Sequence, residues 1–137
     1  MTARRDRLAR LLAIRTVALH AASRDLGKAI GVTTAIAALA RRIGELQVEL
    51  QPAIMSTTGQ QLKASAATRN GLQLVAARQR ARLDAAAAHQ ADAARAVHRD
   101  RAAADAVERA IVRRRAGQTA AATRSASDDQ PVRGQRR

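Results

Sequence analysis

Apolar residues recur along the first third of the chain in alternating steps of four and three. Starting at Leu8, this spacing selects fourteen positions: Leu8, Leu12, Arg15, Leu19, Ala22, Leu26, Ala29, Thr33, Ile36, Ala40, Ile43, Gln47, Leu50 and Ile54. Eleven of the fourteen are apolar, and the pattern persists over six heptads. Because residues at this spacing lie along one face of a helix, the pattern predicts a long helix with a coiled-coil seam.

A second seam of the same kind follows later in the chain. Its twelve positions, nine of them apolar, are Leu72, Ala76, Gln79, Leu83, Ala86, Gln90, Ala93, Val97, Asp100, Ala104, Val107 and Ile111. Between the seams, Pro52 cannot donate a backbone hydrogen bond, and Gly59 adds a flexible point, so the chain should reverse near residues 51–60. Asn70-Gly71 marks either a local kink or a later start of the second helix.

These patterns predict an all-α fold, an antiparallel two-helix coiled-coil hairpin over residues 1–116 with a disordered C-terminal tail over 117–137. Gly117 follows three consecutive arginines, a favourable order for the end of a helix. If position i faces position 112 − i, Ala29 meets Leu83, and the two polar seam residues Thr33 and Gln79 coincide, where they could fix the register.

The composition restricts what such a chain can be. It contains no Phe, Tyr, Trp or Cys, and 36 alanines stand against 28 residues of Leu, Ile, Val and Met. Aromatic side chains carry much of the burial in globular cores, so little material for a compact core remains. The absence of cysteine excludes disulfides, thiol catalysis and cysteine-based metal sites. This composition is typical of long helices that present a surface rather than enclose a pocket.

The motifs that resemble catalytic sites lack the context that such chemistry needs. The segment 27–34 has the letters of a phosphate-binding loop in the wrong order, and we interpret Gly27 and Gly31 as small residues that let two helices approach closely. The triplet His98-Arg99-Asp100 lacks the other kinase motifs, and the three histidines lack metal-ligand spacing. We therefore expect no enzymatic activity, and no catalytic, cofactor-binding or metal-binding residue.

Charge offers the best functional candidates. The 25 basic residues, 23 of them arginine, exceed the 11 acidic ones and give a net charge of +14. Two clusters fall at the same end of an antiparallel hairpin and form the predicted partner-binding site: Arg4, Arg5, Arg7, Arg10 and Arg15, with Arg109, Arg113, Arg114 and Arg115. Arginine forks match carboxylates and phosphates equally well. Two other sources of this pattern stay open, the GC-rich codons of Ala and Arg and the ordinary solvated faces of long helices.

Two segments resemble the flagellar export protein FliJ family: residues 7–15 (RLARLLAIR) and residues 105–115 (DAVERAIVRRR). With the two long helical arms, the resemblance covers about residues 4–116. It implies a cytoplasmic stalk and chaperone of the flagellar type III export apparatus, required for motility. Such a stalk docks on the export ATPase ring, couples it to the membrane-embedded export gate and assists export substrates or chaperones. The two arginine clusters would then contact the ATPase ring.

Two alternatives from other classes remain. The first is an Arg-rich helical nucleic-acid-binding protein, although the chain offers no aromatic stacking platform and no groove-reading motif. The second is amphipathic attachment to an anionic membrane, for which the mostly alanine apolar face lacks aromatic anchors. The longest uncharged stretches, 29–40 and 50–62, are shorter than the roughly 18 residues of a membrane span. We expect a cytoplasmic protein, placed at the inner face of the cell membrane only through the export apparatus.

Overall fold

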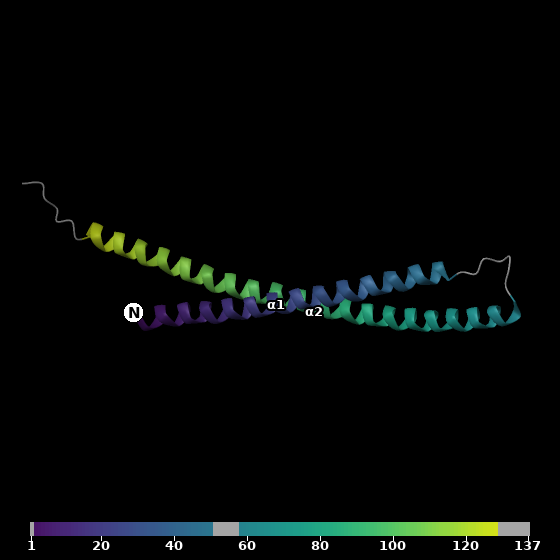
Figure 1. Ribbon diagram of the computed structural model, residues 1–137. Coiled ribbons are helices and arrows are strands. Elements are labelled where there is room, and N and C mark those ends of the chain that lie inside the picture. Colours follow the sequence, from purple (N-terminus) through teal and green to yellow (C-terminus); the bar gives the residue numbers. More distant parts are fainter. Residues whose placement is uncertain (1, 51–57, 129–137) are drawn as a thin grey trace, which may run out of the picture. The chain divides into compact units, whose positions relative to one another are not determined.

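The computed structural model describes residues 2–50 and 58–128 and contains two helices (Figure 1). Helix α1 runs from Thr2 to Glu49 over 48 residues, and helix α2 runs from Gly59 to Asp128 over 70 residues. Of the described residues, only Leu50 and Thr58 lie outside a helix. The two helices pack against each other in opposite directions, which confirms the predicted all-α helical hairpin.

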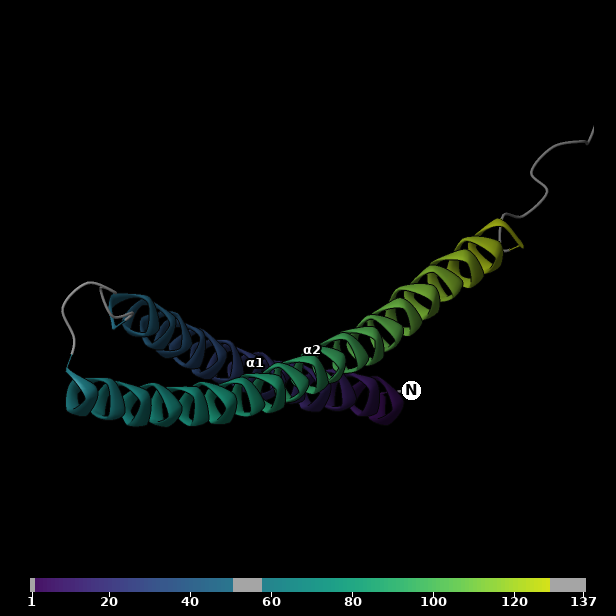
Figure 2. The same ribbon diagram turned by 90° about the vertical axis from the view of Figure 1, so that its right-hand side faces the viewer.

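The chain divides into two compact units, each built from a stretch of both helices. Unit 1 consists of Met1–His20 and His98–Arg137, and unit 2 consists of Ala21–Val97. In unit 2, the blue end of α1 lies beside the teal start of α2 (Figures 1 and 2). Unit 1 contains the purple start of α1 and the green and yellow stretch of α2 (Figure 1).

Helix α2 begins with a side-chain cap. The backbone N–H of Thr58 donates to Oε1 of Gln61 at 3.1 Å, and the N–H of Leu62 donates to the carbonyl of Thr58 at 3.0 Å. A glutamine at the third helical position that reaches back to the residue before the helix is half of a capping box. The chain therefore reverses between Glu49 and Gly59, within the predicted region, although residues 51–57 lie outside the described residues.

The predicted seams form the interface between the helices. All twelve positions of the second seam are buried or half-buried, as are the first-seam positions from Leu8 to Gln47 except the exposed Arg15. The buried apolar side chains of the described residues are Ala29, Ile43 and Ala104, of which two are alanines. Because a buried alanine removes little apolar area from water, this interface stabilises the hairpin only modestly per turn.

Neither Asn70-Gly71 nor Gly117 interrupts α2, so the predicted end at Gly117 is wrong, and residues 117–128 are helical. A glycine costs a helix only about 1 kcal/mol relative to alanine, and the alanines at 120–122 favour continuation. Gln118 extends the seam at the next heptad position and is half-buried. Hydroxyl groups in the segment also donate to backbone carbonyls, as Thr123 Oγ1 does to Thr119 at 2.9 Å. The rest of the predicted tail, residues 129–137, lies outside the described residues.

In unit 1, Leu8 lies near a later part of α2 than the predicted register indicates. Leu8 shares a surface hollow with Ile111 and Arg114 of α2, whereas the rule 112 − i places it opposite Ala104. Ile111 lies one heptad after Ala104, and a shift of seven residues leaves every seam residue facing another seam residue. A repeating seam of small side chains therefore predicts the interface but does not fix the register.

The predicted polar match of Thr33 with Gln79 does not give a hydrogen bond between the two side chains. Thr33 Oγ1 donates to the carbonyl of Ala29 in its own helix at 2.9 Å. Gln79 is buried, and its Oε1 atom has no hydrogen-bond partner in the structure. A buried amide oxygen without a donor costs free energy, because it has lost its contacts with water and gained none.

The interpretation of Gly27 and Gly31 as sites of close helix approach is wrong. Both residues are exposed, and a Cβ atom added to either would meet no atom within 4 Å. Alanine fits both positions and restricts the unfolded backbone more than glycine does. We expect Gly27→Ala and Gly31→Ala each to raise the free energy of unfolding by about 0.5–1 kcal/mol, measured by urea unfolding followed by circular dichroism.

The matched control for the glycine variants is Ala38→Gly, at an exposed position of the same helix. It should lower the free energy of unfolding by a similar amount, because it introduces the backbone freedom that the other variants remove. A loss of stability in Gly27→Ala or Gly31→Ala would contradict the open space around these residues.

Candidate docking surface

The positive charge of the chain is concentrated in unit 1, which contains all nine arginines of the predicted site. Unit 1 carries 15 basic and 6 acidic residues, a net charge of +9, in a smaller share of the sequence than unit 2. Unit 2 carries 10 basic and 5 acidic residues, a net charge of +5. An anionic partner is therefore attracted more strongly to unit 1.

Two arginines of α1 and one of α2 surround a common hollow on the surface of unit 1. It has a volume of about 430 Å³ and is lined by Arg7, Leu8, Arg10, Leu11, Ile14 and Arg114. Residues 7, 11 and 14 follow the spacing of one helix face, as do residues 10 and 14. Arg7 and Arg10 are exposed, and neither has an acidic partner within 4.0 Å among the described residues. We call this site the α1 hollow.

A neighbouring hollow of about 580 Å³ lies on the other side of Leu8 and Arg114, which line both hollows. Its lining includes Arg115 and also one carboxylate, that of Asp6. The side chain of Arg114 is half-buried and takes part in an interaction of its own. Arg114 therefore lines both hollows and is not an unpaired surface charge.

Arg109 and Arg113 lie apart from these hollows, on a face of α2 that also carries acidic residues. They line a hollow of about 450 Å³ together with Asp105, Glu108 and Val112. Because two carboxylates share this hollow with the two arginines, its local charge is close to balanced. We call this site the α2 hollow.

The remaining predicted residues belong to unit 1 but to none of these hollows. Arg15 occupies a seam position, yet its side chain is exposed. Arg4 and Arg5 lie in the first turns of α1, and their side chains fall outside what the structure describes. The structure thus brings Arg7, Arg10 and Arg114 together, and whether any of the nine arginines binds a partner stays a prediction.

Sequence reasoning missed the exposed apolar side chains next to these arginines. Leu11, Ile14 and Val17 are 39%, 65% and 66% exposed on α1. None belongs to the predicted seam. Their spacing of three residues, offset from the seam on the same helix, is the signal that could have found them.

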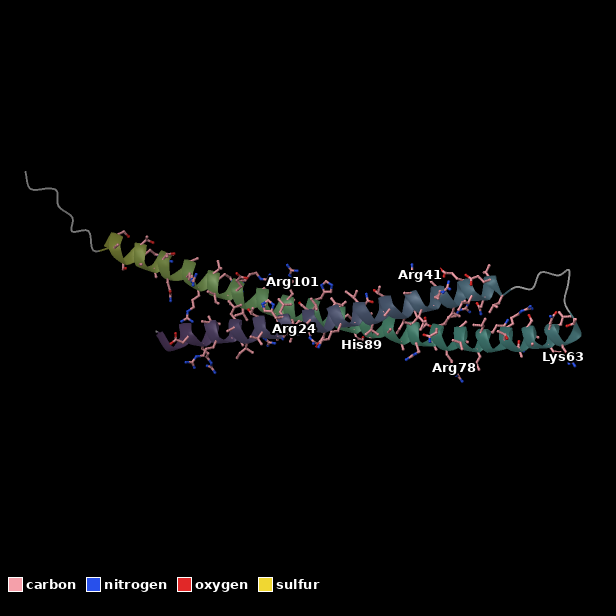
Figure 3. All side chains as sticks on the ribbon, in the orientation of Figure 1. Arg24, Arg41, Lys63, Arg78, His89 and Arg101 are labelled. Atoms are coloured by element: carbon pink, nitrogen blue, oxygen red, sulfur yellow. The ribbon has the colours of Figure 1, made fainter. Side chains whose placement is uncertain are left out.

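Two acidic side chains of unit 2, Glu45 and Glu49, form ion pairs with Arg42. Arg42 Nη1 donates to Glu45 Oε2 at 2.9 Å and lies 3.6 Å from Glu49 Oε1. The hydrogen bond to Glu45, together with the negative charge of Glu49, raises the pKa of Arg42 above its ordinary value. The two carboxylates that share this helix face are therefore both paired with Arg42. Arg41 and Arg78, also in unit 2, project into solvent (Figure 3).

Histidine and acidic side chains are scattered along the described residues. Within this part of the chain, no group of three His, Cys, Asp or Glu side chains could hold a metal ion. Neither described helix contains a stretch long and apolar enough to cross a bilayer. The triplet His98-Arg99-Asp100 contains one ion pair, in which Arg99 Nε lies 3.6 Å from Oδ1 of Asp100.

Comparison with known proteins adds no relative to this description. No family model, no curated protein and no solved structure matches the chain.

Proposed function

We propose that this chain is a non-enzymatic helical docking protein whose unit 1 binds an acidic protein surface. The observation that carries the proposal is the placement of Arg7 and Arg10 of α1 with Arg114 of α2 around one hollow. Guanidinium groups donate two parallel hydrogen bonds to a carboxylate, which adds directional recognition to the attraction of opposite charges. The net charge of +9 on unit 1 increases the rate at which an acidic surface finds it.

We further propose that the acidic surface belongs to the flagellar export ATPase ring, as the resemblance to the FliJ family implies. Both segments that carry the resemblance, residues 7–15 and 105–115, belong to unit 1 and contain the arginines that line its hollows. In this proposal the helical hairpin acts as a stalk between the ATPase ring and the export gate. It would lie in the cytoplasm, at the inner face of the membrane through these partners, and assist export substrates or chaperones.

The test is affinity capture of the full chain from the native cell, followed by titration of the captured ATPase. We expect the ring ATPase to co-purify. Replacing Arg7 and Arg10 by glutamine should weaken its binding by about tenfold, because each exposed ion pair contributes about 0.2–1 kcal/mol. The matched control replaces Arg41 and Arg78 of unit 2 by glutamine, which removes the same charge from exposed positions. That variant should bind within about twofold of the unmodified chain.

The same titration with duplex DNA decides between the two candidate partners. Binding of an Arg-rich protein to phosphates weakens steeply as salt rises. If no ATPase is captured, and DNA binds with a dissociation constant below about 1 μM at physiological salt, the nucleic-acid alternative replaces the proposed function. If the two arginine variants bind the ATPase equally well, the docking surface lies elsewhere on the chain.

A further inference from the structure

The α1 hollow combines apolar side chains with Arg7 and Arg10, neither of which has an acidic partner within 4.0 Å among the described residues. Ile14 is 65% exposed and Leu11 is 39% exposed, although both are large apolar residues. Val17 continues this exposed stripe one turn further along α1. Exposed apolar side chains that are grouped and bordered by charge mark interaction surfaces more often than single exposed ones do.

The composition of the lining indicates which partner fits. Three apolar residues and three arginines line the α1 hollow, and no carboxylate does. The α2 hollow also exposes an apolar side chain, Val112 at 58%, but its arginines share the hollow with Asp105 and Glu108. Arg7 and Arg10 therefore share the α1 hollow with no carboxylate, whereas Arg109 and Arg113 share the α2 hollow with two.

We infer that the α1 hollow binds an amphipathic helix with a ridge of Leu or Ile and flanks of Asp or Glu. An apolar side chain of that ridge packs against Leu11 and Ile14, and its flanking carboxylates accept hydrogen bonds from Arg7 and Arg10. This is the helix-in-groove mode of recognition, in which apolar anchors supply affinity and rim charges supply specificity. The inference rests on the proposed function and names the chemistry of the partner at that same site.

Other candidate partners complement only some of the side chains that line the α1 hollow. A second copy of the chain would bring together two units of net charge +9, and Asp6 is the only acidic residue among the first 20. Duplex DNA supplies phosphates for the arginines but places no apolar group on Ile14. An anionic bilayer supplies both charge and apolar surface, so it is included as an arm of the test.

The test uses two fluorescein-labelled helical peptides of about 18 residues, equal in length and negative charge. One has leucines along one face and glutamates beside them, and the other has glutamines in place of the leucines. Fluorescence anisotropy measures their binding to the full chain. We expect the leucine peptide to bind about tenfold more tightly, because one buried large apolar side chain contributes at least that factor.

Ile14→Ser should abolish this preference and bring the two peptides within about twofold of each other. Val112→Ser is the matched control, since Val112 is also exposed in unit 1 and borders the α2 hollow, where carboxylates are present. It should leave the preference unchanged. Because both side chains are more than half exposed, neither substitution should reduce the helical circular dichroism signal.

The outcomes separate this inference from the function on which it rests. If both peptides bind equally to the unmodified chain while the ATPase is still captured, the apolar recognition is overturned and acidic docking stands. If neither peptide binds and the ATPase is not captured, both proposals fail. If phosphatidylglycerol vesicles bind in an Ile14-dependent manner and the leucine peptide does not, the occupant is a membrane and the inference is overturned.

Discussion

Replacing Ile43 by alanine is expected to lower the free energy of unfolding of the hairpin by about 2–4 kcal/mol. Ile43 is 6% exposed and is the largest of the buried apolar side chains in the described residues. The substitution removes three buried carbon atoms and leaves a cavity that the surrounding helices fill only partly. The chain has no Trp or Tyr, so urea unfolding is followed by far-ultraviolet circular dichroism.

The matched control for Ile43→Ala is Val48→Ala, in the same helix and 68% exposed. It should change the free energy of unfolding by less than about 0.5 kcal/mol, as exposed substitutions usually do. Equal effects of the two variants would show that the seam does not hold the helices together in solution. That result would contradict the predicted hairpin and not merely the size of the effect.

The interface could be predicted from the sequence because helical periodicity is a local property. From Leu72 to Ile111, every position selected by steps of four and three lies in the interior of the helix pair. Once two long helices pack side by side, their apolar stripes must face each other. Arg15 is the exception, since its long charged side chain stays exposed at a seam position. Spacing predicts where a residue lies on the helix, and the chemistry of the side chain decides whether it is buried.

The register and the end of α2 could not be predicted because both depend on small energy differences. A shift of one heptad places Leu8 beside Ile111 instead of Ala104, and both partners are apolar. At Gly117, a penalty of about 1 kcal/mol competes with the helix-favouring alanines that follow and with the seam contact of Gln118. These small free-energy differences depend on packing along the whole helix pair. A local sequence pattern carries no information about that packing.

The arginines of the candidate site could be predicted from the sequence, but the exposed apolar side chains beside them were not. The predicted arginine clusters include Arg7, Arg10 and Arg114, which line one hollow. The seam pattern accounts for the apolar residues at the interface between the helices. It does not include Leu11 and Ile14. Helix α1 thus carries two apolar stripes, of which the first packs against α2 and the second is exposed.

Gln79→Leu is expected to raise the free energy of unfolding by about 1–3 kcal/mol, although it changes a residue of the native interface. Gln79 is 9% exposed, and its Oε1 atom is buried without a hydrogen-bond partner. Leucine removes this unsatisfied oxygen and adds apolar surface to a seam in which four of the twelve positions are alanine. Gln90→Leu, at a half-buried seam position, serves as the control and should change stability by a smaller amount. A loss of stability in Gln79→Leu would show that the oxygen is satisfied in solution, for example by water.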